Sequence, residues 1–340
     1  MAETTHISWA DATFNPVLGC TKVSNGPLGA CVNCYAEVLV DQRFGRAQFG
    51  GLGKGVGTRV RTSDANWKQP LAWNRKAARD GTRPFVFCAS LADVFDNTWE
   101  PAWRSDLFDL IRATPNLVWL LLTKRPQNIA KLFAETITPK LRDAQQHRLG
   151  LSLWPQNAAI GCTVVTQEEA DRDIPVLLAA KAALKPTFAF VSMEPLMGPV
   201  DLTRISTMQF RGAEVLNALT GELTGMFGDP CPTRLLPLDW CITGGESGPN
   251  ARPTDARWLR ALRDQCASAG TAFQLKQNGE HVSGTGSKGG WVYPVNGDRD
   301  TYCWSAADVP LEGGWFATRV GKKAAGRTLD GVIWDQRPNV

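Results

Sequence analysis

The sequence has no long hydrophobic run and none of the features of a secretory leader. No apolar stretch in its 340 residues approaches the roughly 20 residues that a membrane-spanning helix needs. The first 14 residues contain neither a basic region nor an apolar core, so a signal peptide is not expected. We therefore expect a cytoplasmic protein with no membrane partner.

A strong charge imbalance, an internal repeat and a disulfide framework are also missing. The net charge of +4 permits a nucleic-acid partner but does not demand one. Nine cysteines in a chain without a leader favour metal binding or simple burial over disulfides. With 43% hydrophobic and 21% charged residues, the composition is that of an ordinary globular protein, built as one large barrel or two modest domains.

Short apolar runs alternate with helical patterns through most of the chain. Continuous apolar runs of this kind indicate a parallel sheet that is covered on both faces. Together with a further strand that leads into a cysteine-containing loop near the N-terminus, they predict an α/β fold, a full or partial (β/α) TIM-like barrel of about six to seven units. The runs are residues 85–90, 117–122, 158–165, 187–191, 240–243 and 272–275.

Three segments interrupt this alternation. We assign residues 1–280 to the barrel, with a basic insert at 44–79 and a long connection without clear periodicity at 202–238. Residues 281–340 are rich in Gly and Trp, and we expect them to form a C-terminal extension packed on the barrel. The insert is either a solvated basic face or a phosphate-binding surface, with Trp67 and Trp73 available to stack on bases.

Three cysteines gather in one short stretch near the N-terminus. Cys20 follows a glycine, and Cys31 and Cys34 form a C-x-x-C pair after a loop of ten residues. Structural zinc sites and iron–sulfur clusters normally take four protein ligands. The stretch is therefore a zinc site completed by another residue such as His6, a group of buried thiols, or an iron–sulfur cluster with one iron open to a ligand that is not protein.

Polar residues follow the apolar runs, at the end of the strands where barrel enzymes place their chemistry. Each has a structural alternative. Ser90 and Asp93 could cap the next helix, and Lys124 could be a solvated loop lysine. Glu194 could pair with Lys124 or Arg252 and hold the mouth of the barrel in shape. The strand-end residues are Ser90, Asp93, Lys124, Glu194, Glu246 and Lys276.

Several motifs in the chain resemble those of known proteins. N-P-V-L-G-C and C-V-N-C-Y-A, at 15–20 and 31–36, resemble the signature of the spore photoproduct lyase-like branch of radical S-adenosylmethionine (SAM) enzymes. The chain as a whole more closely resembles the phage-associated three-Cys-motif family, which begins with I-S-W-x-D-A-T-x-N-P-x-x-G-C. Further matches are S-L-A-D-V-F-D, L-L-T-K-R-P, M-E-P-L-M-G-P, G-G-E-S-G-P-N-A-R-P and L-K-Q-N-G, beginning at residues 90, 121, 193, 244 and 275.

Two details of the cysteine stretch differ from most radical SAM enzymes. Ten residues separate Cys20 from Cys31 where three are usual, and Asn33 stands where a hydrophobic residue is common. The resemblance nevertheless implies a radical SAM-type enzyme, in which Cys20, Cys31 and Cys34 hold a 4Fe–4S cluster and SAM chelates the fourth iron. It also implies cofactor-binding residues near the strand ends, which we assign as Tyr35, Ser90, Asp93, Lys124, Thr163 and Glu194.

The resemblance to a lesion lyase, the phage association and the basic insert favour a nucleobase substrate, in DNA, RNA or nucleotide form. The family name implies a separate partner protein, and a cluster needs a reductant. Two alternatives remain open: a zinc- or iron–sulfur-stabilised barrel that binds nucleic acid without catalysis, and a radical SAM enzyme that acts on a peptide or partner protein. We assign substrate contacts to Gly245, Glu246, Arg252, Lys276 and Gln277, with a tight strand–helix turn as the alternative for the two glycines before Glu246.

Overall fold

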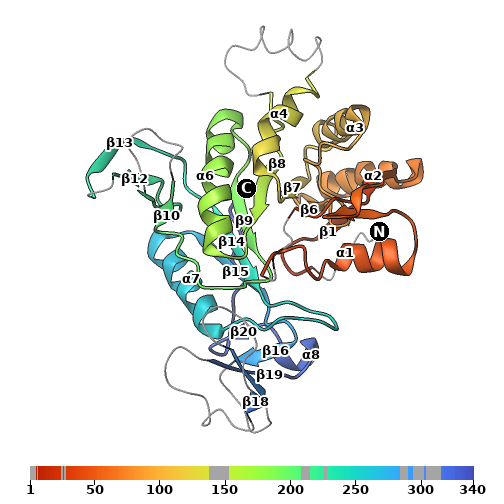
Figure 1. The fold of residues 1–340 in the computed structure, drawn as a ribbon. Helices are drawn as coiled ribbons and strands as arrows, with labels where there is room; N and C mark the ends of the chain where they lie inside the picture. Colours follow the sequence, from red (N-terminus) through yellow and green to blue (C-terminus); the bar gives the residue numbers. More distant parts are fainter. Residues whose placement is uncertain are drawn as a thin grey trace.

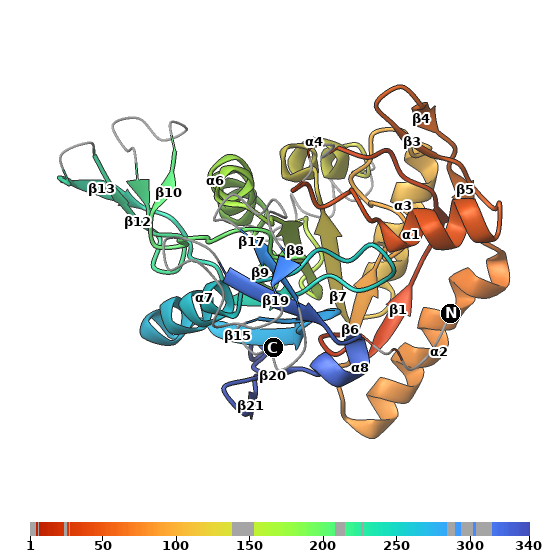
Figure 2. The ribbon, with the colours of Figure 1, turned by 60° about the horizontal axis from the view of Figure 1, so that its bottom comes forward.

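A curled sheet of seven parallel strands forms the centre of the molecule (Figures 1 and 2). The computed structural model describes residues 5, 7–23, 26, 28–137, 153–207, 215–225, 228–283, 290–293, 302–303 and 315–340. Within these residues the sheet is a half-barrel, which confirms the α/β class and the partial form of the barrel. In spatial order the strands are β1 (Ala12–Phe14), β6 (Phe85–Cys88), β7 (Val118–Thr123), β8 (Ala158–Thr163), β9 (Ala189–Met193), β14 (Trp240–Gly244) and β15 (Ala272–Gln277).

Helices follow most of the strands and cover the outer face of the sheet (Figure 1). Because strand residues alternate between faces, each apolar run contributes to two cores. Val86 and Trp119 belong to the outer core with the helices, whereas Phe87 and Trp240 belong to an aromatic core on the concave face. The helices are α2 (Asp64–Asp80), α3 (Pro101–Arg112), α4 (Ile129–Ala134), α6 (Gln167–Leu184) and α7 (Ala256–Ala269).

Thr166 and Glu169 form hydrogen bonds at the N-terminus of α6. Thr166 accepts a hydrogen bond from the amide of Glu169 at 3.3 Å, and the Glu169 carboxylate accepts one from the amide of Val165 at 2.9 Å. Orphan amides at the start of the helix are thereby satisfied. None of the helices that the structure describes is both long and apolar enough to cross a bilayer.

The basic insert is a folded part of the barrel, and its basic residues Lys68, Arg75, Lys76 and Arg79 are exposed on α2, as the alternative of a solvated face predicts. Its tryptophans are buried in α2: Trp67 packs edge-on against Phe14, with ring centroids 5.8 Å apart, and the Arg61 guanidinium lies 3.9 Å from the Trp67 ring. The expectation that Trp67 and Trp73 stack on bases is therefore wrong, because both pack in the core.

Several short elements precede α2 in the chain. They are α1 (Tyr35–Glu37), a π-helix (Val38–Arg43), a hairpin of β3 (Phe49–Gly51) and β4 (Gly55–Gly57), and β5 (Val60–Arg61), which pairs with β2 (Val17–Leu18).

Two further antiparallel sheets lie outside the barrel. The long connection contains four strands beside α6 and α7, although its sequence shows no clear periodicity (Figure 1): β10 (Ile205–Ser206), β11 (Val215–Leu216), β12 (Glu222–Thr224) and β13 (Pro230–Arg234). The C-terminal part contains β16 (His281–Ser283), β17 (Gly290–Tyr293), β18 (Tyr302–Cys303), β19 (Trp315–Arg319), α8 (Lys322–Ala325), β20 (Thr328–Leu329) and β21 (Val332–Ile333).

The C-terminal residues contact both edges of the half-barrel. Trp334 packs edge-on against Phe273 of β15, with ring centroids 6.0 Å apart. Arg337 pairs with Asp11, the residue before β1, at 3.1 Å. β1 and β15 are the two edge strands, and in the described residues no backbone pairing connects them. The end of the chain therefore connects the two edges through side-chain contacts.

Candidate functional site

The cysteine stretch lies against loops that follow the carboxyl ends of the central strands. It leaves β1 at one edge of the sheet and contacts the loops after β6, β7 and β14. Gly19, just before Cys20, has a positive φ of 96°, and a Cβ atom there would collide with the carbonyl oxygen of Thr58. Only glycine suits this close approach of two backbones, so the position of Cys20 is set by the residue before it.

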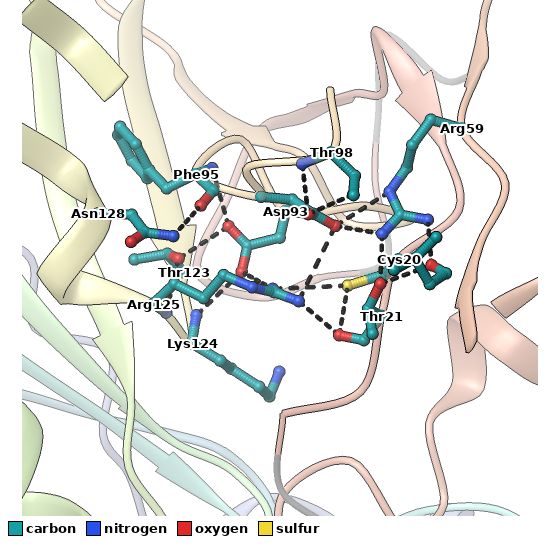
Figure 3. Close-up of polar contacts among 12 residues, drawn as sticks. Cys20, Thr21, Arg59, Asp93, Phe95, Thr98, Thr123, Lys124, Arg125 and Asn128 are labelled. Atoms are coloured by element: carbon teal, nitrogen blue, oxygen red, sulfur yellow. Dashed lines mark hydrogen bonds and ion pairs between the residues drawn. The ribbon is translucent and has the colours of Figure 1, made fainter. Parts of the chain in front are cut away.

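Arg125, at the end of β7, binds Cys20 directly (Figure 3). Its Nη1 donates to the sulfur of Cys20 at 3.8 Å and to Oδ2 of Asp93 at 2.8 Å. Its Nη2 donates to the carbonyl oxygen of Thr21 at 2.5 Å. One guanidinium therefore holds both the first cysteine sulfur and the backbone that follows it.

Two buried carboxylates hold this guanidinium in place. Asp93 also accepts hydrogen bonds from the Thr123 hydroxyl at 2.7 Å and the Lys124 amide at 3.2 Å. Asp96 lies 3.8 Å from Arg125 and binds the buried guanidinium of Arg59 at 2.5 and 3.0 Å. We call Arg59, Asp93, Asp96 and Arg125 the Asp–Arg network. Its two positive and two negative charges balance, as buried charges must.

The charges of the Asp–Arg network shift the pKa values around it. Burial and the nearby Asp93 charge raise the pKa of the Cys20 thiol to about 12, although Arg125 opposes the shift. Burial would lower the pKa of Arg125, but Asp93 and Cys20 outweigh it, so this pKa is raised. Burial would raise the pKa of Asp96, yet Arg125 and the hydrogen bonds from Thr98 leave it below its usual value. Both Arg125 and Asp96 thus stay ionised.

A second network holds the other end of the cysteine stretch. Glu246, after β14, binds the Arg252 guanidinium through both carboxylate oxygens at 2.7 and 2.8 Å. Asn33, between the last two cysteines, donates to Glu246 at 3.0 Å and to the Asn250 carbonyl at 2.8 Å. Arg252 also donates to the carbonyl oxygen of Gly29 at 3.2 Å. We call Asn33, Glu246 and Arg252 the Glu246 network.

Glu194, at the end of β9, forms a third polar group. Lys276 reaches both of its carboxylate oxygens at 2.8 Å, and the Gln277 amide donates to one of them at 2.8 Å. Gln277 also donates to the carbonyl oxygen of Gly245 at 3.2 Å. A Cβ atom on Gly245 would collide with the Asn278 carbonyl, so the backbones of the β14 and β15 ends meet there. Glu194 is thus paired, but with Lys276 and not with Lys124 or Arg252.

The ammonium group of Lys124 has no hydrogen bond or ion pair with any residue that the structure describes. In Figure 3 its side chain extends past the Asp–Arg network with no contact drawn to the nitrogen. Burial would lower the pKa of Lys124, but its electrostatic interaction with Cys31, Cys34 and Cys20 outweighs burial and raises the pKa. Lys124 thus lies within electrostatic range of all three thiols.

The remaining predicted cofactor-binding residues lie at the same edge of the sheet. The Tyr35 hydroxyl donates to the carbonyl oxygen of Ser90 at 2.6 Å, and the Asn15 amide donates to the Ser90 hydroxyl at 3.0 Å. Thr163 is buried at the last position of β8. His6, the suggested fourth zinc ligand, lies outside the described residues.

The donor set at this edge consists of three free thiols, of which Cys31 is buried and the other two are partly exposed. Sulfur ligands of this kind suit an iron–sulfur cluster or zinc. Across the described ranges, no group of three or more His, Cys, Asp or Glu side chains is close enough to hold a metal ion. The three thiols have one further feature in common, which is that each raises the pKa of Lys124.

Several residues of this site were not identified from the sequence. Arg59, Asp96 and Asn33 contact partners far along the chain, and one sequence does not reveal such pairs. Asp96 and Arg125 lie inside the matched segments S-L-A-D-V-F-D and L-L-T-K-R-P, which was the signal that could have identified them. Gly245, Glu246 and Arg252 were assigned to substrate, and their described contacts are with the cysteine stretch and the β15 end.

The chain matches a protein-family model. A family model described as "Protein of unknown function (DUF5131)" covers residues 4–338, nearly the whole chain. No curated protein matches the chain. Function therefore has to be inferred from the residues of the site itself.

Proposed function

We propose that this chain, which belongs to the DUF5131 family, is a radical SAM-type enzyme that modifies or repairs a nucleobase. One observation carries the proposal: three free thiols and the ammonium of Lys124, which has no bonded partner in the described residues, lie within electrostatic range of one another at the carboxyl edge of a half-barrel. The motif resemblance of residues 7–36 supports it independently of the geometry. The carboxyl edge of parallel strands is also where barrel enzymes carry their active sites.

Each part of the site has a role in this proposal. Cys20, Cys31 and Cys34 would hold a 4Fe–4S cluster, and SAM would bind beside it at the strand ends. When bound, these cofactors supply an electron and an adenosyl radical that removes a hydrogen atom from substrate. Lys124 would bind the carboxylate of SAM, because an unpaired ammonium is a suitable point-charge partner for that group.

The substrate side of the site lies toward β9, β14 and β15. Glu194 and the substrate residues assigned above occupy this side, and the Lys276–Glu194 pair gives it one charge of each sign. A nucleobase offers hydrogen-bond donors and acceptors that suit such a pair. A nucleic acid or nucleotide substrate, a partner protein and a reductant remain part of the proposal.

Anaerobic purification with and without cluster reconstitution tests the function. We expect wild-type protein to hold about four iron and four sulfide ions per chain, as one cubane cluster requires. On reduction with dithionite in the presence of SAM it should form 5′-deoxyadenosine. Cys34→Ser should lose the cluster, whereas Cys231→Ser, which changes a half-buried cysteine in β13, should retain it.

The outcomes separate the proposal from its alternatives. A colourless wild-type protein that holds one zinc ion and forms no cluster on reconstitution would reject the enzyme and favour a zinc-stabilised binding protein. A protein that cleaves SAM but does not shift DNA or RNA in a gel at any salt concentration would favour a peptide substrate. Lys124→Met should keep the cluster and lose the change in its EPR spectrum that SAM binding produces.

A further inference from the structure

We infer that Arg125 is a positioning residue that sets the reduction potential of the cluster through its hydrogen bond to Cys20. The inference rests on the proposed function, since it requires a cluster on the three cysteines. It concerns a residue that the motif comparison did not assign to the site. It makes the three cysteine ligands unequal, with Cys20 in a different electrostatic environment from the other two.

The geometry of Arg125 fits this role. Its side chain is only 7% exposed, and separate nitrogens of its planar fork contact the sulfur of Cys20 and the backbone oxygen of Thr21. Asp93 and Asp96 bind the same fork from the other side, at 2.8 and 3.8 Å. The guanidinium is therefore fixed before any cluster binds, and no rearrangement is needed for it to donate to the sulfur.

The other two cysteines lack such a donor. In the described part of the chain no side chain donates to the sulfur of Cys31 or Cys34. Their end of the stretch is held by Arg252, which binds the carbonyl oxygen of Gly29 and the carboxylate of Glu246. Arg125 and the less deeply buried Arg252 thus hold the same loop. In the described residues, Arg125 touches a proposed cluster ligand and Arg252 does not.

The physical effect has a definite direction. Reduction adds one electron from an external donor to the cluster and makes it more negative. A hydrogen bond to a ligand sulfur stabilises the reduced form more than the oxidised form, and a fixed positive charge in a site of low dielectric constant does the same. Arg125 should therefore raise the reduction potential and make the cluster easier to reduce.

A redox titration followed by EPR tests this inference with matched variants. Arg125→Lys keeps the charge next to Asp93 but removes the planar fork that reaches Cys20 and Thr21. We expect it to lower the equilibrium constant for cluster reduction about tenfold, which is about 59 mV for a one-electron couple. Arg252→Lys, the control, alters the same loop without touching sulfur and should change this constant by no more than about twofold.

A second measurement keeps the test independent of the folding of the variant. In wild-type protein grown with arginine labelled with ¹⁵N in the guanidinium group, pulsed EPR of the reduced cluster should detect a weak coupling to nitrogen. Absence of this coupling, or equal potentials in wild type and Arg125→Lys, would overturn the inference while leaving the proposed enzyme intact. Absence of any cluster in wild type would overturn both.

Discussion

The two networks that hold the cysteine stretch differ in burial and in what they bind. The Asp–Arg network is almost completely buried: the side chains of Asp96 and Arg59 are 1% and 4% exposed, and it reaches a cysteine sulfur through Arg125. The Glu246 network is closer to solvent, with Arg252 16% exposed, and it binds the Gly29 carbonyl and the Asn33 amide of the stretch. The first network fixes a cysteine sulfur, whereas the second fixes the course of the loop.

The largest expected difference between the networks is in stability. Arg125→Met leaves Asp93 without its guanidinium partner in a buried setting, and breaking a buried pair in this way costs about 3–5 kcal/mol. Arg252→Met removes charge-assisted hydrogen bonds nearer to solvent, so we expect a loss of about 1–3 kcal/mol. Urea denaturation of the two variants measures both values. Equal losses would show that burial does not distinguish the networks.

Acid should weaken the Glu246 side of the molecule through His281. Burial and the Arg319 charge lower the pKa of His281 from 6.5 to about 4, against the opposing charges of Glu280 and Glu246. Because the unfolded chain binds this proton more tightly, the stabilisation is complete above pH 6.5 and is lost as the pH falls to 4.

The expected loss of unfolding free energy from His281 is about 3 kcal/mol over that range. Comparing wild type with His281→Phe at each pH isolates this contribution from the carboxylates that titrate nearby. A pH profile identical in both proteins would contradict the assignment.

A smaller effect should follow from Asn33. Asn33→Ala removes hydrogen bonds to Glu246 and Asn250, which should lower the free energy of unfolding by about 1–3 kcal/mol, toward the lower end because the side chain is partly exposed. Amide hydrogen exchange in the segment around Cys31 and Cys34 should become faster, while exchange at Thr21 should stay unchanged. Faster exchange at both places would mean that the two networks act as one unit.

The smallest change in stability should come from Lys124. Its ammonium makes no bond in the described residues, so Lys124→Met should change the free energy of unfolding by no more than about 0.5 kcal/mol. The same variant should lose SAM binding, measured by calorimetry on the reconstituted protein. A large loss of stability would show that Lys124 supports the fold and is not a free binding group.

The strands and helices of the barrel were predictable because they depend on local patterns. Apolar runs such as that of β7 become buried on both faces of a parallel sheet, and the periodicity of α7 places Leu259 and Leu262 in the core. The networks were not predictable, because Arg125 finds Cys20 across 105 positions and Asn33 finds Glu246 across 213. Trp67 misled the prediction because a buried aromatic residue and a base-stacking one look alike in a basic segment.

The open sheet gives the cysteine stretch a mechanical role. In the described residues the half-barrel has no backbone pairing between β1 and β15, and the stretch runs from the end of β1 to the loop after β14. Arg125 and Arg252 hold this stretch at Cys20 and at Gly29, so a change in the width of the mouth would be transmitted to the backbone that carries the cysteines. The separation of the two open edges and the spacing of the thiols are thus mechanically linked.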